Sequence, residues 1–370
     1  MYKRIIKPIL FLMSPDFVHR MTMVMGRAVQ FFAPVRALLR KWWRYDHPNL
    51  SQNIFGIDFK NPVGLSAGLD KNVELVPLME SVGFGFESGG SVTLAPRKGN
   101  PHPWFHRLPK TGSLVIHAGM ANKGLDVIGK NIKRNRPKVL AMPLMVSVAV
   151  VSKTTKETCD DAIIDARNTT LYVLQHKLAQ AIEINISCPN VGDDQPFTEP
   201  EMLERLLESL DSLERHVPFF IKMPNLKSIR KFDALLKVIV RHNIQGVTIA
   251  NLVKNRKEVD LKEPLADEVK GGFSGLPTKE RSLALINHTY NKYHDKLIII
   301  GVGGIFSAED AYEKIKAGAN LLAMITGVIF EGPQLVGQIN KQLVELLKRD
   351  GYRSISDAVG ANHKNLKKSL

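Results

Sequence analysis

The chain has 370 residues, of which 44% are hydrophobic and 24% are charged, enough for one large single-core domain or two smaller ones. This composition excludes a disordered chain, a collagen-like repeat and a disulfide-stapled mini-protein. The formal net charge of 51 − 36 = +15 predicts an acidic partner: phosphate, a carboxylate substrate, nucleic acid or an anionic membrane. The longest stretches without a charged residue, 139–152 and 317–330, have 14 residues each, short of the roughly 20 that a membrane-spanning helix needs. Two cysteines in the whole chain suit a reducing compartment.

The first 50 residues are both basic and rich in large apolar side chains. They carry nine Lys or Arg residues against two acidic ones, Asp16 and Asp46. Basic residues interleaved with Phe, Met and Trp are typical of an amphipathic segment that lies at a membrane interface. Helices that pack on their own domain show the same pattern, and the two interpretations are compatible. Pro8 interrupts the apolar run, which disfavours a signal peptide. We therefore expect residues 1–45 to form a helical extension that contacts an anionic membrane surface.

From residue 57 onward, short apolar or glycine-containing runs alternate with longer amphipathic segments, which is typical of parallel β/α units. Eight runs are predicted strands, at 61–67, 84–90, 141–150, 181–187, 218–224, 246–251, 296–301 and 320–326. The clearest predicted helices lie at 199–216, 226–241, 277–294, 307–317 and 333–349. Eight units match a closed (β/α)8 TIM barrel, which we expect over residues 46–350. An open doubly wound sheet is the alternative. We expect the basic segment 351–370 to be a solvated, poorly ordered tail.

In a barrel of this type, chemistry takes place at the carboxyl ends of the strands, and the unusual residues of this sequence follow predicted strands. Small residues and a lysine occur at the end of the first strand, two amides and a thiol occur at the end of the fourth, and a lysine lies in the fifth. Glycine-rich loops after strands seven and eight are the usual phosphate site of this fold. The residues concerned are Gly64 to Lys71, Asn185 to Asn190, Lys222, Asn251, Gly301 to Gly304, Thr326 and Gly327.

Seven motifs occur in order within the first 345 residues. They are NPVGLSAGLDKN (61–72), GFGFESGGSVT (83–93), GNPHPWFHRL (99–108), INISCPN (184–190), GGFSG (271–275), IIGVGGI (299–305) and TGVIFEGP (326–333). Together they resemble the dihydroorotate dehydrogenase family, whose members are FMN-containing (β/α)8 enzymes. The resemblance implies oxidation of dihydroorotate to orotate, a step of pyrimidine biosynthesis, with FMN as the cofactor.

The resemblance also implies roles for individual residues around the flavin. Lys222 is expected beside N1 and C2=O of the ring, where a cation stabilises the reduced, anionic form. Ser91 and Ser147 stand at flavin-contacting positions that are usually threonine and asparagine. The residues expected to bind FMN are Ser66, Ala67, Gly68, Ser91, Ser147, Asn185, Lys222, Gly275, Gly303, Gly304, Thr326 and Gly327.

By the same resemblance, Lys71, Asn190 and Asn251 are expected to bind the substrate, and Cys188 to be the base that removes its proton. The quinone-using class of the family normally has serine where this chain has Cys188. A thiol has a pKa of about 8.5, so a fraction of the thiol groups is ionised to thiolate at neutral pH, whereas serine needs a further base. The substitution should therefore keep the role and lower the working pH. The alternative for Cys188 is an inert buried thiol, which is the interpretation we favour for Cys159.

The N-terminal segment, including SPDFVHR (14–20), further resembles the membrane-associated, quinone-using class. In that class, two small N-terminal helices frame an apolar tunnel through which a quinone reaches the flavin. His19 and Arg107 match polar residues near the quinone. This implies a membrane quinone as electron acceptor and a peripheral location at the cytoplasmic face of a membrane, the inner membrane in a bacterium.

Other positions depart from the family's pattern and predict a more apolar substrate pocket. Ile116 replaces a substrate-binding amide, Leu252 replaces a threonine or serine, and Ile325 replaces a tyrosine. Buried amides contribute about 1–3 kcal/mol each to the recognition of a polar ring. These departures favour a second hypothesis, a diverged flavoprotein that keeps FMN but acts on another substrate or only binds flavin. A nucleic-acid partner is disfavoured, because no interleaved aromatic and basic motif occurs in the barrel. No metal site is expected.

Overall fold

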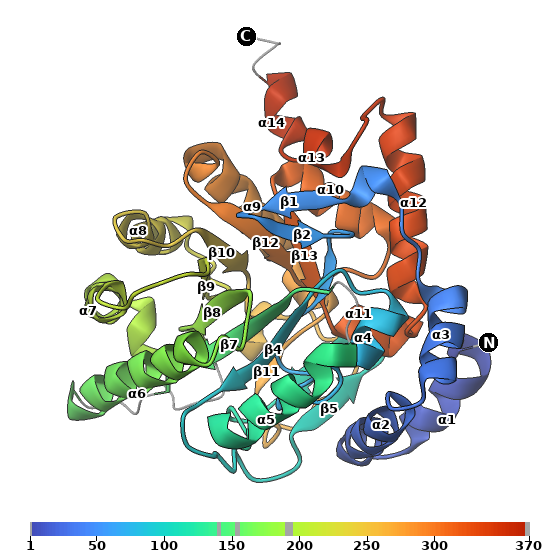
Figure 1. Ribbon diagram of the computed structural model, residues 1–370, viewed down its shortest axis with the longest axis horizontal. Coiled ribbons are helices and arrows are strands. Elements are labelled where there is room, and N and C mark those ends of the chain that lie inside the picture. The colour runs from blue at the N-terminus through green and yellow to red at the C-terminus, as the bar shows by residue number, and fades with distance from the viewer. Residues whose placement is uncertain (1, 139–141, 152–155, 189–194, 367–370) are drawn as a thin grey trace.

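The computed structural model describes residues 2–138, 142–151, 156–188 and 195–366, and a closed barrel of eight parallel strands lies at its centre (Figure 1). β13 pairs with β3 and closes the ring. The strands are β3 (Val63–Leu65), β4 (Glu87–Val92), β7 (Leu144–Ala149), β8 (Ala181–Asn185), β9 (Phe219–Lys222), β10 (Gly246–Ile249), β12 (Ile298–Val302) and β13 (Leu321–Met324). Each overlaps a strand predicted from the sequence. The (β/α)8 barrel is therefore confirmed, and the open sheet is wrong.

Amphipathic helices cover the outside of the barrel. In α8 (Ile229–Ile239), Phe232, Leu235, Leu236 and Ile239 recur at helical spacing and are buried in the core shared with the strands. The other helices of this layer are α4 (Val76–Val82), α5 (Leu125–Asn135), α6 (Lys156–Gln175), α7 (Pro200–Asp211), α9 (Lys279–Tyr293), α10 (Ala308–Ala317), α11 (Thr326–Glu331) and α12 (Leu335–Arg349). The five helices predicted most clearly are confirmed.

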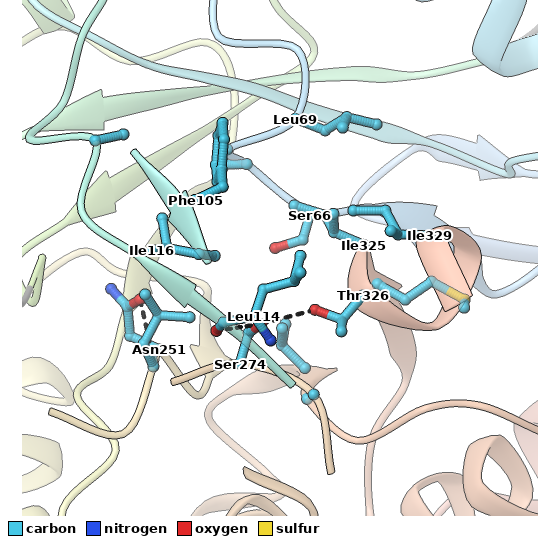
Figure 2. Close-up of a pocket in the computed structure, with 18 of the residues that line it drawn as sticks. Ser66, Leu69, Phe105, Leu114, Ile116, Asn251, Ser274, Ile325, Thr326 and Ile329 are labelled. Carbon is cyan, nitrogen blue, oxygen red and sulfur yellow. Dashed lines mark hydrogen bonds between the residues drawn. The ribbon is translucent and has the colours of Figure 1, made fainter. Parts of the chain in front are cut away.

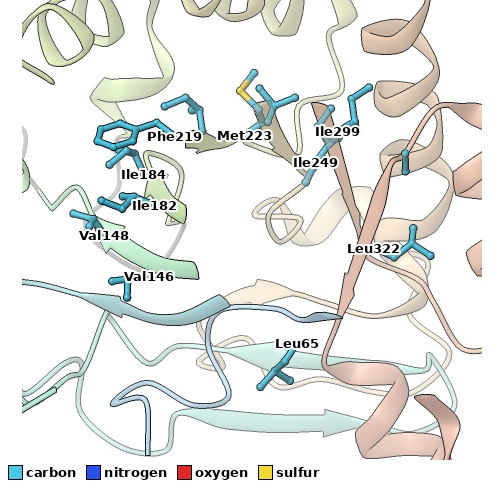
Figure 3. Close-up of a cluster of buried hydrophobic side chains, with 14 of the residues drawn as sticks. Leu65, Val146, Val148, Ile182, Ile184, Phe219, Met223, Ile249, Ile299 and Leu322 are labelled. Carbon is cyan, nitrogen blue, oxygen red and sulfur yellow. The ribbon is translucent and has the colours of Figure 1, made fainter. Parts of the chain in front are cut away.

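The strands separate two apolar layers. Side chains that point outward pack in the main core, where Figure 3 shows Val146, Ile182 and Ile184 on neighbouring strands. Inside the barrel, Phe86 and Phe220 form a second cluster with the hairpin of β1 (Gln52–Ile54) and β2 (Ile57–Phe59). This hairpin, which the sequence did not predict, covers the amino-terminal end of the barrel.

A small antiparallel sheet is a second element that the sequence did not predict. It consists of β5 (Phe105–Leu108), β6 (Ser113–Ile116) and β11 (Gly272–Phe273), with β6 in the middle. We call it the cover sheet, because it contributes to the wall of the cavity at the carboxyl ends of the barrel strands. The cover sheet joins segments about 150 residues apart in the chain, which local sequence patterns do not specify.

The helices expected in residues 1–45 are present as η1 (Tyr2–Ile6), α1 (Lys7–Leu12), α2 (Pro15–Val29) and α3 (Ala33–Trp43). They pack on the barrel domain, near α4 and the cover sheet (Figure 1). Arg27 pairs with buried Glu74 at 3.0 Å, and Arg40 pairs with buried Glu80 at 3.2 Å. Within the described part of the chain, no helix combines the length and the apolar character that crossing a membrane requires.

The expectation of a solvated, poorly ordered end is wrong for residues 351–363. Two short helices, α13 (Ile355–Ala358) and α14 (Ala361–Leu366), follow α12 and pack on α10. Ile355 and Ala358 are fully buried. Apolar burial outweighs the basic composition here, because the lysines of this segment all follow residue 363.

Candidate active site

A cavity lies at the carboxyl ends of the barrel strands, against the cover sheet (Figure 2). Figure 2 shows Phe105 and Ile116 on one side and Ile325 on the other. The predicted site residues that line it are His19, Ser66, Ala67, Gly68, Lys71, Ser91, Arg107, Asn185, Cys188, Lys222, Asn251, Gly275, Gly303, Gly304, Thr326 and Gly327. Two predicted residues are not among them. Ser147 is fully buried beside the wall, and Asn190 lies outside the described residues.

A continuous set of hydrogen bonds runs along one wall of the cavity. Ser91 Oγ lies 2.9 Å from Ser147 Oγ and accepts a hydrogen bond from Asn185 Nδ2 at 2.9 Å. Asn251 Nδ2 donates to Asn185 Oδ1 at 3.3 Å, and to the carbonyl and hydroxyl oxygens of Ser187 at 2.9 and 3.1 Å. These bonds fix the orientation of both amides. Ser187 was missed in the sequence, although its position inside the INISCPN motif was a usable signal.

Two loops at the cavity form a cradle for an anion. Gly303 and Gly304, which follow β12, have φ angles of +101° and +67°. A Cβ on Gly303 would lie 2.3 Å from Thr278 Oγ1, so no side chain fits there. After β13, the hydroxyl of Thr326 lies 2.9 Å from that of Ser274. Glycines held in this way leave backbone N–H groups accessible to phosphate. The cradle therefore fits the phosphate of FMN.

The barrel interior beneath the cavity contains a buried ion pair. Lys222 Nζ lies 3.8 Å from Glu183 Oε1, and Ser88 Oγ donates to the same oxygen at 3.4 Å. Glu183 was missed in the sequence. The signal was available, because a carboxylate between two isoleucines in a buried strand needs a partner.

Lys71 lies in the loop after β3 and lines the cavity near the cover sheet. Its ammonium donates to the carbonyl of Gly68 at 2.8 Å and lies 5.0 Å from the centre of the Phe105 ring. Burial lowers the pKa of Lys71 to about 8, although Asp70 and Asp16 act in the opposite direction. A lysine with this pKa is charged at neutral pH and loses its charge in mildly alkaline solution.

His19 and Arg107 line the part of the cavity next to the N-terminal helices. The His19 ring lies 5.1 Å from that of Phe105, and burial together with the Lys71 charge lowers the pKa of His19 to about 3. Arg107 donates to the carbonyl of Met13 at 2.7 Å and lies 4.6 Å from the centre of the Phe11 ring. His19 is therefore neutral at physiological pH, and Arg107 supplies a cation in this part of the cavity.

Cys188 follows β8 and its half-buried side chain lines the cavity. Cys159 is buried in the main core, which agrees with its predicted role as a packing residue.

The departures from the family's pattern also lie in the cavity wall. Ile116, Leu252 and Ile325 line the cavity, together with Met120. The cavity therefore combines two fixed amides and two lysines, Lys71 and Lys222, with a wall that is more apolar than the family's pattern implies. Among the described residues, no group of three or more His, Cys, Asp or Glu side chains is arranged to hold a metal ion.

Taken together, the fold and the cavity define a class of protein: a (β/α)8 barrel with a phosphate cradle after its last two strands, a buried lysine below the cavity and fixed amides beside it. Comparisons with known proteins agree with this class. The family model described as dihydroorotate dehydrogenase matches residues 49–347. This chain belongs to the dihydroorotate dehydrogenase family.

Individual relatives support this assignment. The chain is 33% identical over 361 residues to the dihydroorotate dehydrogenase (quinone) of Nocardia farcinica, with 96% of both chains covered. It is 31% identical over 358 residues to the protein of the same name from Mycobacterium tuberculosis, covering 96% of this chain and 97% of that one. The crystal structure of ligand-free DHODH from Eimeria tenella superposes with a TM-score of 0.81 at 25% identity, over 94% of this chain and 99% of that one.

Proposed function

We propose that this chain is an FMN-dependent dihydroorotate dehydrogenase, which oxidises dihydroorotate to orotate in pyrimidine biosynthesis and passes the electrons to a quinone. The observation that carries the proposal is a single cavity that joins the phosphate cradle, the fixed amides and the face of α2 that carries His19. The names of the curated relatives support the same reaction and the same acceptor.

In this proposal FMN is held by the cradle at its phosphate and by the wall at its ring. Gly303, Gly304 and Thr326 would hold the phosphate, and Ser66 to Gly68 would contact the ring. When bound, FMN supplies the acceptor for a hydride. Lys222 would place a positive charge at the edge of the ring. Ser147 would support this wall through Ser91.

The substrate would bind between the flavin and the cover sheet. Lys71 would pair with its carboxylate, and Asn190 and Asn251 would bind the ring. Cys188 would act as the base: its sulfur takes the proton from the carbon next to the carbonyl, while the hydride leaves the neighbouring carbon. A base in this role must lie within hydrogen-bond reach of the proton, and a thiolate has a suitable pKa near neutrality.

We further propose that a quinone enters beside α1 and α2, past His19 and Arg107, and that the extension lies on an anionic membrane surface. Large apolar side chains are exposed along residues 1–45, with Leu12 at the end of α1 at 89%, Trp42 in α3 at 66% and Phe32 just before α3 at 62% exposed. The same segment carries nine basic residues. Apolar contact and electrostatic attraction add at a lipid headgroup layer. The protein would then be peripheral, at the cytoplasmic face of the membrane.

Anaerobic spectroscopy tests the function directly. We expect the purified protein to carry one non-covalent FMN, which bleaches when dihydroorotate is added without oxygen and regains its colour when a short-chain quinone follows. A protein that takes up no FMN, or whose flavin does not respond to dihydroorotate, would contradict the proposal.

A second candidate, oxidation of a different substrate in the same cavity, is favoured by one observation: Ile116, Met120 and Leu252 line the cavity. The same experiment separates the two candidates. Under the second candidate, dihydroorotate leaves the flavin oxidised while another compound bleaches it.

A further inference from the structure

The interior of the barrel contains the ion pair between Glu183 and Lys222. In the proposed function Lys222 acts on the flavin, whereas Glu183 has no role of its own. The eight barrel strands are fully described, and three of their residues are charged: Glu87, Glu183 and Lys222. Glu183 and Lys222 pair with each other at 3.8 Å, and their side chains are 2% and 6% exposed. Glu87 points out of the barrel, because its neighbours Phe86 and Ser88 face the interior. The pair is therefore the only charged pair on the inner face of these strands.

Glu183 lies between the cavity and the apolar cluster at the other end of the barrel. It precedes Asn185 by two residues on β8, so both side chains point inward. Asn185 is the register partner of Lys222 on β9, and both line the cavity. Ala181, two residues before Glu183, belongs to the apolar cluster. The carboxylate is therefore placed to act on the ammonium from the side away from the cavity.

We propose that Glu183 is a positioning residue, which keeps the Lys222 ammonium charged below the cavity and so sets the reduction potential of the bound flavin. This inference rests on the proposed FMN-dependent function. A buried ammonium is costly unless a carboxylate compensates it, and it loses its proton when that carboxylate is removed. A neutral Lys222 would no longer stabilise negative charge on the reduced flavin, and the flavin would become harder to reduce.

The test is the midpoint potential of the FMN-loaded protein between about pH 6 and about pH 9, the range in which an unpaired buried lysine titrates. We expect Glu183→Gln to have at least the wild-type potential at the acidic end, where Lys222 remains protonated. At the alkaline end, its potential should fall to that of Lys222→Met. Glu183→Asp keeps the carboxylate and should follow the wild type.

A double variant shows whether Glu183 acts through the lysine. With Lys222→Met in place, Glu183 has no cation and takes up a proton, so a further Glu183→Met change should leave the potential where Lys222→Met alone puts it. This comparison also decides the question if Glu183→Gln does not fold, because replacing both partners of a buried pair by apolar residues is usually tolerated.

The other titratable side chains described around the cavity, His19, Lys71, Arg107 and Cys188, are the same in every variant, so differences between variants report on the pair. Glu87→Gln is the matched control. It removes an equally buried carboxyl on the outer face of β4, and we expect it to leave the potential unchanged.

The inference is overturned if Glu183→Gln keeps the wild-type potential at every pH. It is also overturned if the effects at Glu183 and Lys222 add in the double variant. A wild-type protein without a flavin spectrum is a different result, because it refutes the proposed function before any potential is measured.

Discussion

The carboxylate of Asp16 accepts a hydrogen bond from the backbone N–H of Trp104 at 3.0 Å. Its second oxygen accepts one from the N–H of Phe105 at 3.2 Å, at the start of β5. A single side chain near the start of α2 therefore attaches the N-terminal extension to the cover sheet. His19, one turn further along α2, is thereby held against Phe105 and the cavity.

Asp16→Ala should impair the quinone step much more than reduction of the flavin at saturating dihydroorotate. Hydrogen bonds to a charged acceptor contribute about 1.5–3 kcal/mol each, so we expect α2 to loosen and the KM for quinone to rise about tenfold or more. Stopped-flow measurement of each half-reaction checks this. Asp46→Ala is the control, because Asp46 pairs with Arg44 instead of the cover sheet. An equal loss in both half-reactions would contradict the role given to Asp16.

Deletion of residues 1–45 should spare FMN binding and abolish quinone reduction. The full-length chain should bind vesicles of anionic lipid, and binding should weaken as salt rises, because nine basic residues contribute to it. Vesicle co-sedimentation of both forms is the measurement. Failure of the full-length protein to bind at any salt concentration would count against the membrane contact.

Gly303→Ala should weaken FMN binding by about 100-fold or more, because moving the loop away from Thr278 would break two or more hydrogen bonds to a charged phosphate. Fluorescence titration of the apoprotein with FMN measures this loss. Gly56→Ala is the matched control: its φ of +75° resembles those of the cradle, but no atom lies within 4 Å of the added Cβ. Unchanged FMN affinity in Gly303→Ala would place the phosphate elsewhere.

The KM for dihydroorotate should depend on the charge of Lys71. The pKa of Lys71 is about 8, so the ammonium is present below this pH and is lost above it. We expect a constant KM up to about pH 8 and then a rise approaching tenfold per pH unit. Lys71→Met should have a high KM that no longer changes over this range. A variant that retains the wild-type pH profile would show that another group titrates.

Cys188→Ala should abolish flavin reduction by dihydroorotate while FMN remains bound, because the proton has no acceptor. Cys188→Ser should keep some activity with its pH profile displaced upward, since a hydroxyl has a much higher pKa than a thiol. Rapid-mixing absorbance of the flavin measures both. Cys159→Ala is the control, a thiol buried in the core, and it should reduce its flavin normally. Wild-type flavin reduction in Cys188→Ala would make that thiol a packing residue.

Glu87→Gln should stabilise the fold in alkaline solution. Burial, and then the Asp70 carboxyl, raise the pKa of Glu87 well above its ordinary value of 4.5. Stability that depends on the protonated form is complete below about pH 4.5 and is lost as pH rises through the folded-state pKa, by up to about 1.4 kcal/mol per pH unit. The variant cannot lose that proton. Urea unfolding near pH 5 and pH 8.5 should show its advantage growing with pH; a constant difference would contradict this account.

The sequence by itself determined the eight strands and most of the helices that cover them. Burial of one face produces a repeat of two residues in a strand or of three to four in a helix, and this repeat is a property of neighbouring residues. The role of Gly303 and Gly304 as a candidate phosphate site could also be predicted from the sequence, because their position after the seventh strand follows from the order of the elements.

Only the tertiary structure decided which distant residues meet. The cover sheet pairs Ile116 with Gly272, and the interior ion pair joins Glu183 to Lys222. These residues are far apart in the chain, so a periodic pattern of neighbouring residues cannot predict that they meet. The same holds for the C-terminal helices. Their basic composition predicted a solvent-exposed tail, but the side chain of Ile355 is buried against the domain. These contacts form because closing the barrel brings strand ends together, and burial then requires each polar group to find a partner.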